Sequence, residues 1–246
     1  MAPVYPAPPL VEVLADFRFL PGEPWDIAVP GLLYDRIREE FPDREQHIAV
    51  NVRAEQDGLQ QRIEIPQRIR FARPDDSALV QVGPDLLTVN HLKPYPTWAP
   101  FAELIRRVLG HYEDVARPEG LRRIGLRHIN IVEFADERIE LGDYFTYHPH
   151  VPDALPQLHG FFSVQTHLAY REGRDFLSLT VRSQERDPGE GGLGVVLDLD
   201  YVTPGEGVVP LTDVVGWLES AHAEIETAFE ACITDRTRAL FGADED

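Results

Sequence analysis

Strict alternation of apolar and polar residues in one early segment constrains this fold more than any other feature of the chain. In residues 10–19, LVEVLADFRF, the apolar members of the alternation share one face: Val11, Val13, Ala15, Phe17 and Phe19. The charged members, Glu12, Asp16 and Arg18, share the other. A period of two places one face of a strand on a core and the other toward water. The segment therefore predicts a half-buried β-strand in a sheet that is covered on one side.

Further segments are predicted as strands from their β-branched and apolar content and from the turns between them. They are residues 68–73, 78–82, 86–91, 121–134, 161–170, 175–183 and 193–201. Turn compositions separate neighbours, with PDDS after residue 73, GPD before residue 86 and EGR inside a hairpin. Residues 42–62 are polar and have no clear period, so the sequence does not assign them.

Helical spacing of apolar residues predicts three main helices. The first covers residues 26–41, where Pro30 limits the start. Its buried stripe is expected at Ile27, Leu32, Leu33, Ile37 and Phe41. The second follows Thr97, a suitable N-cap, and has Pro100 in its first turn. Its apolar stripe is expected at Phe101, Leu104, Ile105, Val108 and Leu109. The last begins near Thr212, and its buried stripe is expected at Leu211, Val214, Leu218, Ala221, Ile225, Phe229 and Cys232. A short helix is also expected near 138–146.

The order of these elements predicts an α+β fold of antiparallel sheets covered by helices, with a long C-terminal helix. Strand, helix, three strands and helix occur twice along the chain, which suggests an internal duplication of architecture without a residue-level repeat. We expect an N-terminal α+β half at 1–120 and a C-terminal half at 121–246. A chain of 246 residues can bury one large core, so the halves are expected to form one compact unit.

Composition excludes several protein classes. The chain is 43% hydrophobic and 26% charged, which is typical of a globular protein. No apolar run reaches the roughly 18 to 20 residues that cross a bilayer, and the N-terminus does not resemble a signal peptide. Cys232 is the only cysteine, which excludes an internal disulfide. A soluble cytoplasmic protein without membrane contact is expected.

The excess of acidic over basic residues limits which binding partners are expected. The formal net charge is −19, with 19 acidic and 13 basic residues in 1–120 and 23 and 10 in 121–246. Nucleic-acid binding depends on basic side chains, so nucleic acid is not expected as a general partner. The acidity favours either simple solubility or a surface that meets a basic protein. Four arginines allow one local basic patch: Arg62, Arg68, Arg70 and Arg73.

Four stretches together resemble a known protein family. They are PPLVEVLADFRF at 8–19, VNHLKPYPTWAPF at 89–101, RIGLRHIN at 123–130 and AFEACITDRTRALFG at 228–242. This combination, over nearly the whole chain, resembles an uncharacterised family of bacterial proteins with a sporadic distribution across genomes. The family has no established activity to transfer, and its pattern favours tyrosine where this chain has His128. The sporadic distribution implies an accessory role, such as defence or neutralisation of a toxin.

Two stretches supply candidate binding residues. In RIGLRHIN, Ile124 and Leu126 share a face with His128 and Asn130, whereas Arg127 lies on the other, followed there by Ile129 and Ile131. The apolar side is therefore expected to switch midway along the strand, as it would at a bulge or where a strand passes from one core to another. These polar residues predict either a buried hydrogen-bond network, which we favour, or a pocket in which Arg127 grips a carboxylate or phosphate.

The second stretch is HLKPYPTW. Lys93, the only lysine, lies with Tyr95 and Trp98 where a strand-like run meets two prolines. Tyrosine and tryptophan beside a cation are frequent at recognition surfaces, and equally frequent where they close the end of a core. We interpret this stretch as a structural corner, with a binding surface as the alternative.

Two functions remain open. The chain contains no phosphate-binding loop and no G-x-S-x-G motif, and no cofactor or metal is expected. We therefore lean toward a non-enzymatic interaction module with a protein partner encoded nearby. The alternative is an enzyme or small-ligand binder with a pocket between the halves that uses Arg127, His128 or Asn130. The sequence also allows a homodimer through a sheet edge or the last helix.

Overall fold

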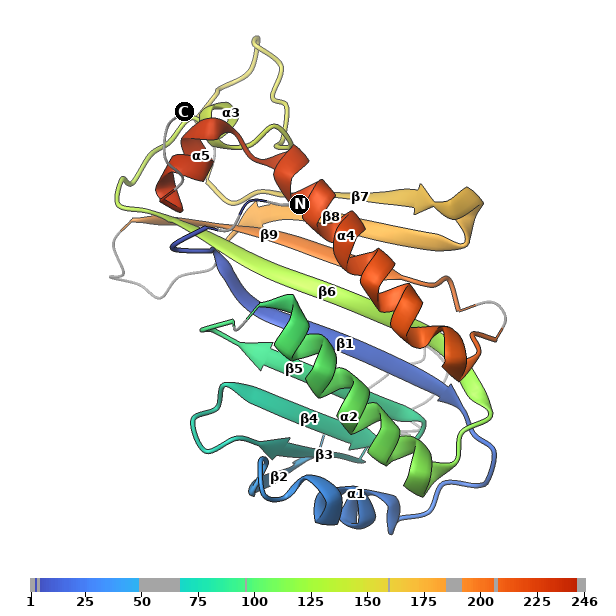
Figure 1. Ribbon diagram of the computed structural model, residues 1–246. Coiled ribbons are helices and arrows are strands. Elements are labelled where there is room, and N and C mark those ends of the chain that lie inside the picture. The colour runs from blue at the N-terminus through green and yellow to red at the C-terminus, as the bar shows by residue number, and fades with distance from the viewer. Residues whose placement is uncertain are drawn as a thin grey trace, which may run out of the picture. The chain divides into compact units, whose positions relative to one another are not determined.

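A computed structural model describes residues 3, 5–48, 67–95, 97–158, 160–184, 192–205 and 208–242. The strands form one antiparallel sheet of nine, in the order β2-β3-β4-β5-β1-β6-β9-β8-β7 (Figure 1). With its helices, the chain has the predicted α+β fold, in one sheet rather than several. It divides into two compact units, here called the central unit (Leu14–Ile124 and Gly205–Asp213) and the terminal unit (Met1–Val13, Gly125–Pro204 and Val214–Asp246). Strands β1 and β6 contribute residues to both.

The central unit is a meander of strands with two helices. Its strands are β1 (Leu10–Leu20), β2 (Asp43–Ile48), β3 (Gln67–Ala72), β4 (Ala78–Gly83) and β5 (Leu86–Leu92). Its helices are α1 (Val29–Ile37) and α2 (Trp98–Ala116). Helix α2 packs on the sheet through a buried stripe: Phe101, Leu104, Ile105, Val108, Leu109 and Tyr112. The sequence pattern predicted five of these six residues.

The terminal unit also combines antiparallel strands with helices. Its strands are β6 (Gly120–Phe134), β7 (Ser163–Tyr170), β8 (Asp175–Ser183) and β9 (Leu193–Val202). Its helices are α3 (Leu141–Tyr144), α4 (Val214–Cys232) and α5 (Asp235–Leu240), with short 3₁₀ turns at Arg171–Gly173 and Leu211–Asp213. Helix α4 lies along the sheet (Figure 1), and its buried side chains are Val214, Trp217, Leu218, Ala221, Ile225, Ala228 and Cys232.

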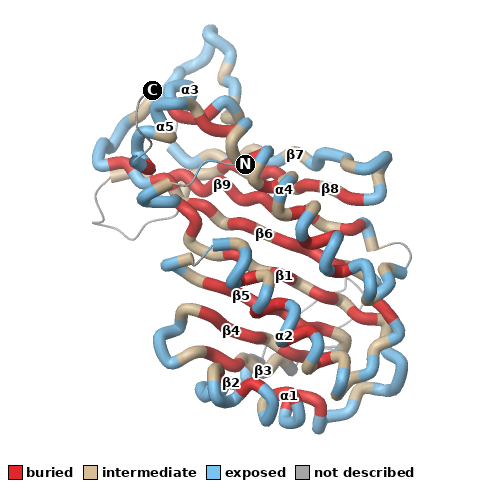
Figure 2. Tube along the Cα trace, viewed as in Figure 1, coloured by how far each residue is buried: buried red, intermediate tan, exposed pale blue. Residues whose placement is uncertain are grey.

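The alternation in β1 has the predicted effect on burial. Val13, Ala15, Phe17 and Phe19 are buried, and the residues between them are only partly covered. Buried segments run along the inner strands, whereas loops and outer helix faces are exposed (Figure 2). Period-two alternation therefore identified both the strand and its core face.

Several expectations about element bounds were wrong. The central unit has four strands between its helices, because β2 forms within residues 42–62, which the sequence left unassigned; residues 49–62 of that segment lie outside the described residues. Helix α1 is shorter than predicted, and Ile27, expected on its buried stripe, is 78% exposed. Thr97 is the N-cap of α2, but its hydroxyl makes no capping hydrogen bond.

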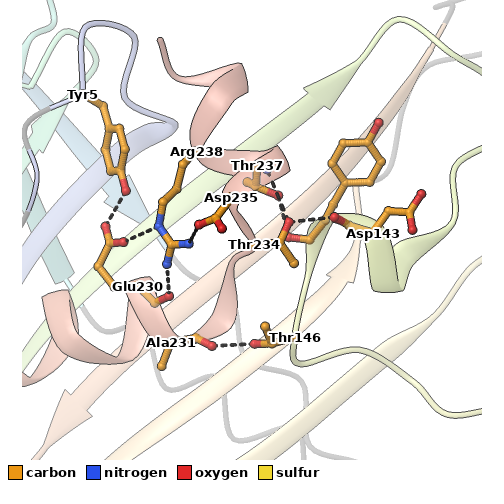
Figure 3. Close-up of polar contacts among 10 residues, drawn as sticks. Tyr5, Asp143, Thr146, Glu230, Ala231, Thr234, Asp235, Thr237 and Arg238 are labelled. Atoms are coloured by element: carbon orange, nitrogen blue, oxygen red, sulfur yellow. Dashed lines mark hydrogen bonds and ion pairs between the residues drawn. The ribbon is translucent and has the colours of Figure 1, made fainter. Parts of the chain in front are cut away.

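Polar contacts fasten the N-terminal segment to the end of α4 within the terminal unit (Figure 3). The Tyr5 hydroxyl donates to Glu230 Oε1 at 2.7 Å, and Arg238 Nε donates to the other oxygen of Glu230 at 3.0 Å. Burial and the hydrogen bond to Glu230 raise the pKa of Tyr5 to about 12. The Ala7 amide also donates to the Phe241 carbonyl at 3.0 Å. Two segments far apart in sequence thus close one end of this unit.

Candidate functional site

The corner after β5 is an aromatic cluster in the central unit. The Tyr95 ring packs edge-on against His91 and Phe101, with centroids 6.0 Å from each. Trp98 meets the same Phe101 ring at 6.2 Å, and Lys93 is exposed. Tyr95 and Trp98 therefore share Phe101 as a packing partner, an arrangement typical of a core end.

A polar network lies behind this cluster. His91 Nδ1 lies 2.8 Å from the Leu92 carbonyl, and its Nε2 lies 3.4 Å from Arg73 Nη1. A neutral imidazole with its proton on Nδ1 satisfies both contacts. Burial, with the Arg73 charge, lowers the pKa of His91 despite the contact with the Leu92 carbonyl. Burial opposes ionisation of Glu40, but Arg73 and Arg107 outweigh it and lower the pKa of Glu40. The ion pair between Arg73, just after β3, and Glu40, just after α1, holds these two elements together. Its charges are therefore already neutralised.

The expected basic patch is mostly neutralised in the described part of the chain. Arg70 pairs with Glu45 at 3.0 Å and with Asp76 at 3.3 Å. Arg73 pairs with Glu40. Arg62 lies outside the described residues. These ion pairs reduce the positive charge that an acidic ligand would meet.

In the terminal unit, the RIGLRHIN stretch directs its polar side chains to opposite faces of β6. Arg127 Nε donates to Asp198 Oδ1 at 2.7 Å, and its Nη2 bonds the other carboxylate oxygen. This bidentate hydrogen bonding to Asp198, which outweighs burial, raises the pKa of Arg127. Arg127 was expected to bind a ligand carboxylate in bidentate fashion. It makes those hydrogen bonds to Asp198 of the neighbouring strand β9 instead.

His128 and Asn130 lie on the other face of β6, in the core beside α4. The Asn130 amide donates to the Leu197 carbonyl of β9 at 3.2 Å. The His128 and His222 rings lie 5.7 Å apart. Burial, together with the nearby His222, lowers the pKa of His128 to about 3, and burial lowers that of His222 to about 4. Both imidazoles are neutral at pH 7. The favoured interpretation, a buried polar network, describes Asn130 and its contact with β9.

The structure thus divides the six predicted site residues into separate groups. Lys93, Tyr95 and Trp98 belong to the central unit, whereas Arg127 and His128 belong to the terminal unit on opposite faces of one strand, with Asn130 on the His128 side. The apolar face of β6 does not switch along its length, and its register with β9 is continuous from Gly125 to Phe134. The expected change of face midway along RIGLRHIN does not occur.

Sequence reasoning missed a buried carboxylate in the terminal unit. Asp175, 2% exposed, accepts hydrogen bonds from Trp217 Nε1 at 3.1 Å and from the Tyr201 hydroxyl at 3.3 Å. Arg171 lies 3.4 Å from the same carboxylate. A signal was present, because Asp175 has the same parity in β8 as the core residues Leu177, Leu179 and Val181. A carboxylate on the core face of a strand needs partners.

Sequence reasoning also missed an exposed apolar loop that leads into β7. Leu155, Leu158 and Phe161 are 54%, 72% and 70% exposed. The Gln157 amide holds the loop by donating to the carbonyls of Pro152 and Leu155 at 3.0 and 2.8 Å. This ordered turn presents apolar side chains outward, a feature associated with contact surfaces.

Metal-binding groups, membrane-spanning helices and similar known proteins were each searched for, and none identifies a function. Within the described residues, no group of three or more His, Cys, Asp or Glu side chains is placed to hold a metal ion. No helix in the described ranges is long and apolar enough to cross a membrane. Comparisons with protein-family models, curated proteins and solved structures gave no match.

Proposed function

We propose that this chain is a non-enzymatic interaction module that binds a basic surface of a protein partner through the outer face of α4. Helix α4 has four glutamates, Glu219, Glu224, Glu226 and Glu230, and no lysine or arginine. Residues seven and eleven apart lie near the same side of a helix, so three of these glutamates form a line. This acidic ridge, Glu219, Glu226 and Glu230, is the observation that carries the proposal.

Glu226 and Glu230 have polar neighbours among the described side chains, and burial raises the pKa of Glu226. His222 lies 3.2 Å from Glu226, but its lowered pKa of about 4 leaves the imidazole uncharged. Glu230 is paired with Arg238 at 3.0 Å. The apolar stripe on the opposite side of α4 packs on its own sheet, and along the ridge Glu219 is exposed whereas Glu226 and Glu230 are half-buried. A rigid helix with aligned like charges suits electrostatic steering of a basic partner.

The resemblance to a sporadically distributed bacterial family supports an accessory role of this kind. A partner encoded beside such a protein, as in defence or toxin-neutralising pairs, is the natural source of a complementary basic surface. The alternative, an enzyme or small-ligand binder, has less support because Arg127 already binds Asp198 and because His128 lies on the other face of β6.

The test is affinity capture with the tagged full-length chain from its native host, followed by mass spectrometry and titration with the purified captured protein. The double variant Glu219→Lys and Glu226→Lys is expected to weaken binding of that protein at least tenfold, because two of the three charges on the ridge reverse. Glu39→Lys with Glu137→Lys makes the same change in net charge at exposed sites away from α4 and is expected to leave binding nearly unchanged. Equal loss in both double variants, or no neighbour-encoded partner, would contradict the proposal.

A further inference from the structure

We infer that two copies of this chain pair antiparallel through β7 and so extend the sheet of the terminal unit across a two-fold axis. The inference is independent of the proposed function, because it uses a different surface and a different partner. It rests on the composition of the sheet edges, on the distribution of charge and on the backbone register of β7.

The two edge strands of the sheet differ in how they are protected. Natural edge strands carry charged residues or proline, which discourage pairing with another chain. Strand β2 follows this rule with Asp43, Arg44 and Glu45 in its DREQHI sequence. Strand β7, SVQTHLAY, has no charged residue and no proline over eight residues. The unprotected edge is therefore β7.

Charge identifies a second copy as the occupant. Residues 147–184, which contain β7, its preceding loop and β8, hold three acidic and three basic residues, whereas the whole chain carries −19. A basic partner gains no attraction from a neutral edge. Two copies of an acidic chain repel one another least where each is neutral. Residues 147–184 form a stretch of the terminal unit without net charge, so two copies can approach there with little repulsion.

The backbone register fixes how the copies would pair. Ser183 N donates to the Phe162 carbonyl at 3.0 Å, so this pair belongs to the hydrogen-bonded set of the β7–β8 ladder. Alternation along the ladder directs the even-numbered residues of β7 to β8. The backbone N–H and C=O groups that face the free edge therefore belong to Ser163, Gln165, His167 and Ala169.

One two-fold register uses all four of these residues. It places Ser163 opposite Ala169 of the second copy and Gln165 opposite His167, in hydrogen-bonded pairs. Thr166 then lies opposite Thr166 of the second copy, and Leu168, 38% exposed, lies opposite Val164. Directly opposed residues share a face of the extended sheet, as antiparallel pairing requires. The edge is thus complementary to itself.

The exposed loop supplies apolar area beside this strand pair. A stable interface buries about 1,200–2,000 Å² in total, which is more than a single strand pair provides. Phe161 precedes β7 by two residues, and Leu155 and Leu158 extend the exposed apolar surface along the loop. These side chains flank the proposed pairing and are expected to be covered by it.

Cysteine cross-linking tests the register directly. Residues opposed in a non-hydrogen-bonded antiparallel pair have Cα atoms about 4.5 Å apart, within the range for a disulfide. Thr166→Cys is therefore expected to give a covalent dimer under mild oxidation of the folded chain. Native Cys232 is buried, and burial raises the pKa of its thiol to about 11, so it does not compete. Gln46→Cys on the other edge strand, β2, is the matched control and is expected to remain monomeric.

Solution mass tests the dimer without a cross-link. The wild-type chain is expected to show a concentration-dependent dimer in sedimentation equilibrium, and Gln165→Lys with His167→Lys is expected to shift it to a monomer. Both positions are exposed, and circular dichroism of the variant checks that it is folded. The added lysines reduce the net negative charge, so general repulsion cannot explain the loss. A wild-type monomer throughout the micromolar range, or a dimer that survives both lysines and does not cross-link at residue 166, would overturn the inference.

Discussion

Individual polar side chains in this protein have their properties set by which face of a strand they occupy. Arg127 and His128 are neighbours in sequence, yet one binds Asp198 in a bidentate ion pair and the other is buried beside α4. Burial makes charging of His128 and His222 unfavourable, and their pKa values fall to about 3 and about 4. The free energy of unfolding therefore depends on pH through these two histidines.

We predict that stability falls steeply as the pH drops from about 6.5 toward 4. Both histidines have folded-state pKa values below the unfolded value of about 6.5, so the unfolded chain binds more protons in this interval. Their contribution is complete above pH 6.5, and each loses about 1.4 kcal/mol per pH unit as the pH falls. Urea unfolding at several pH values measures this slope.

The matched variants separate the buried histidines from general acid effects. His128→Gln removes one titrating group and is expected to reduce the slope in this interval by about 1.4 kcal/mol per pH unit. His150→Gln, at an exposed loop position outside the proposed strand pairing, is expected to leave the slope unchanged. Equal slopes for the wild type and His128→Gln would contradict the assignment.

Elements of the terminal unit are joined by polar contacts as well as by apolar packing. Asp175 at the start of β8 accepts hydrogen bonds from Tyr201 of β9 and Trp217 of α4. One buried carboxylate therefore fixes the position of the long helix along two strands. The energy of such a contact lies mainly in the cost of leaving its donors unpaired.

We predict that Asp175→Ala lowers the free energy of unfolding by about 3 kcal/mol, because it leaves two buried donors without their acceptor. Asp153→Ala, at an exposed loop position, is expected to change it by less than about 0.5 kcal/mol. Denaturant midpoints and tryptophan fluorescence measure both effects, since Trp217 reports on the site itself. A loss no larger in Asp175→Ala than in Asp153→Ala would show that the network adds little stability.

At the scale of the whole molecule, the net charge of −19 acts in opposite directions on the two proposed associations. Binding of a basic protein gains from attraction, which salt screens. Pairing of two acidic copies is opposed by repulsion between the surfaces outside the neutral edge, which salt also screens. The two associations therefore differ in the sign of their salt dependence.

We predict that raising the ionic strength from 0.05 M to 0.5 M, values on either side of the range in which screening lengths are about 8–10 Å, strengthens the β7 dimer and weakens partner binding. Sedimentation equilibrium follows the first, and calorimetric titration with the captured partner follows the second. A β7 dimer whose stability does not change with salt would mean that repulsion between the surfaces outside β7 is negligible. Partner binding that strengthens with salt would contradict the acidic ridge.

The sequence by itself determined eight of the nine described strands, the main helices and the core face of most elements. Period-two alternation at 10–19 and helical stripes at 101–109 and 214–232 depend only on local geometry and burial, so they can be recognised without coordinates. The face of β6 was predicted wrongly, because the expected switch within 123–130 does not occur. Strand β2 was not predicted because its residues 43–46 are polar and exposed, which leaves no apolar alternation to recognise there. Helix α1 was overextended because apolar Ile27 was assumed to be buried.

The tertiary structure alone decided which side chains meet. Arg127 and Asp198 are 71 residues apart in sequence, and Asp175 and Trp217 are 42 apart, so no local pattern could pair them. The order of strands also placed β7 at an edge, which made its uncharged sequence significant. Periodicity reports how each element faces a core, whereas contacts between elements depend on strand order and register, which are set by long-range pairing.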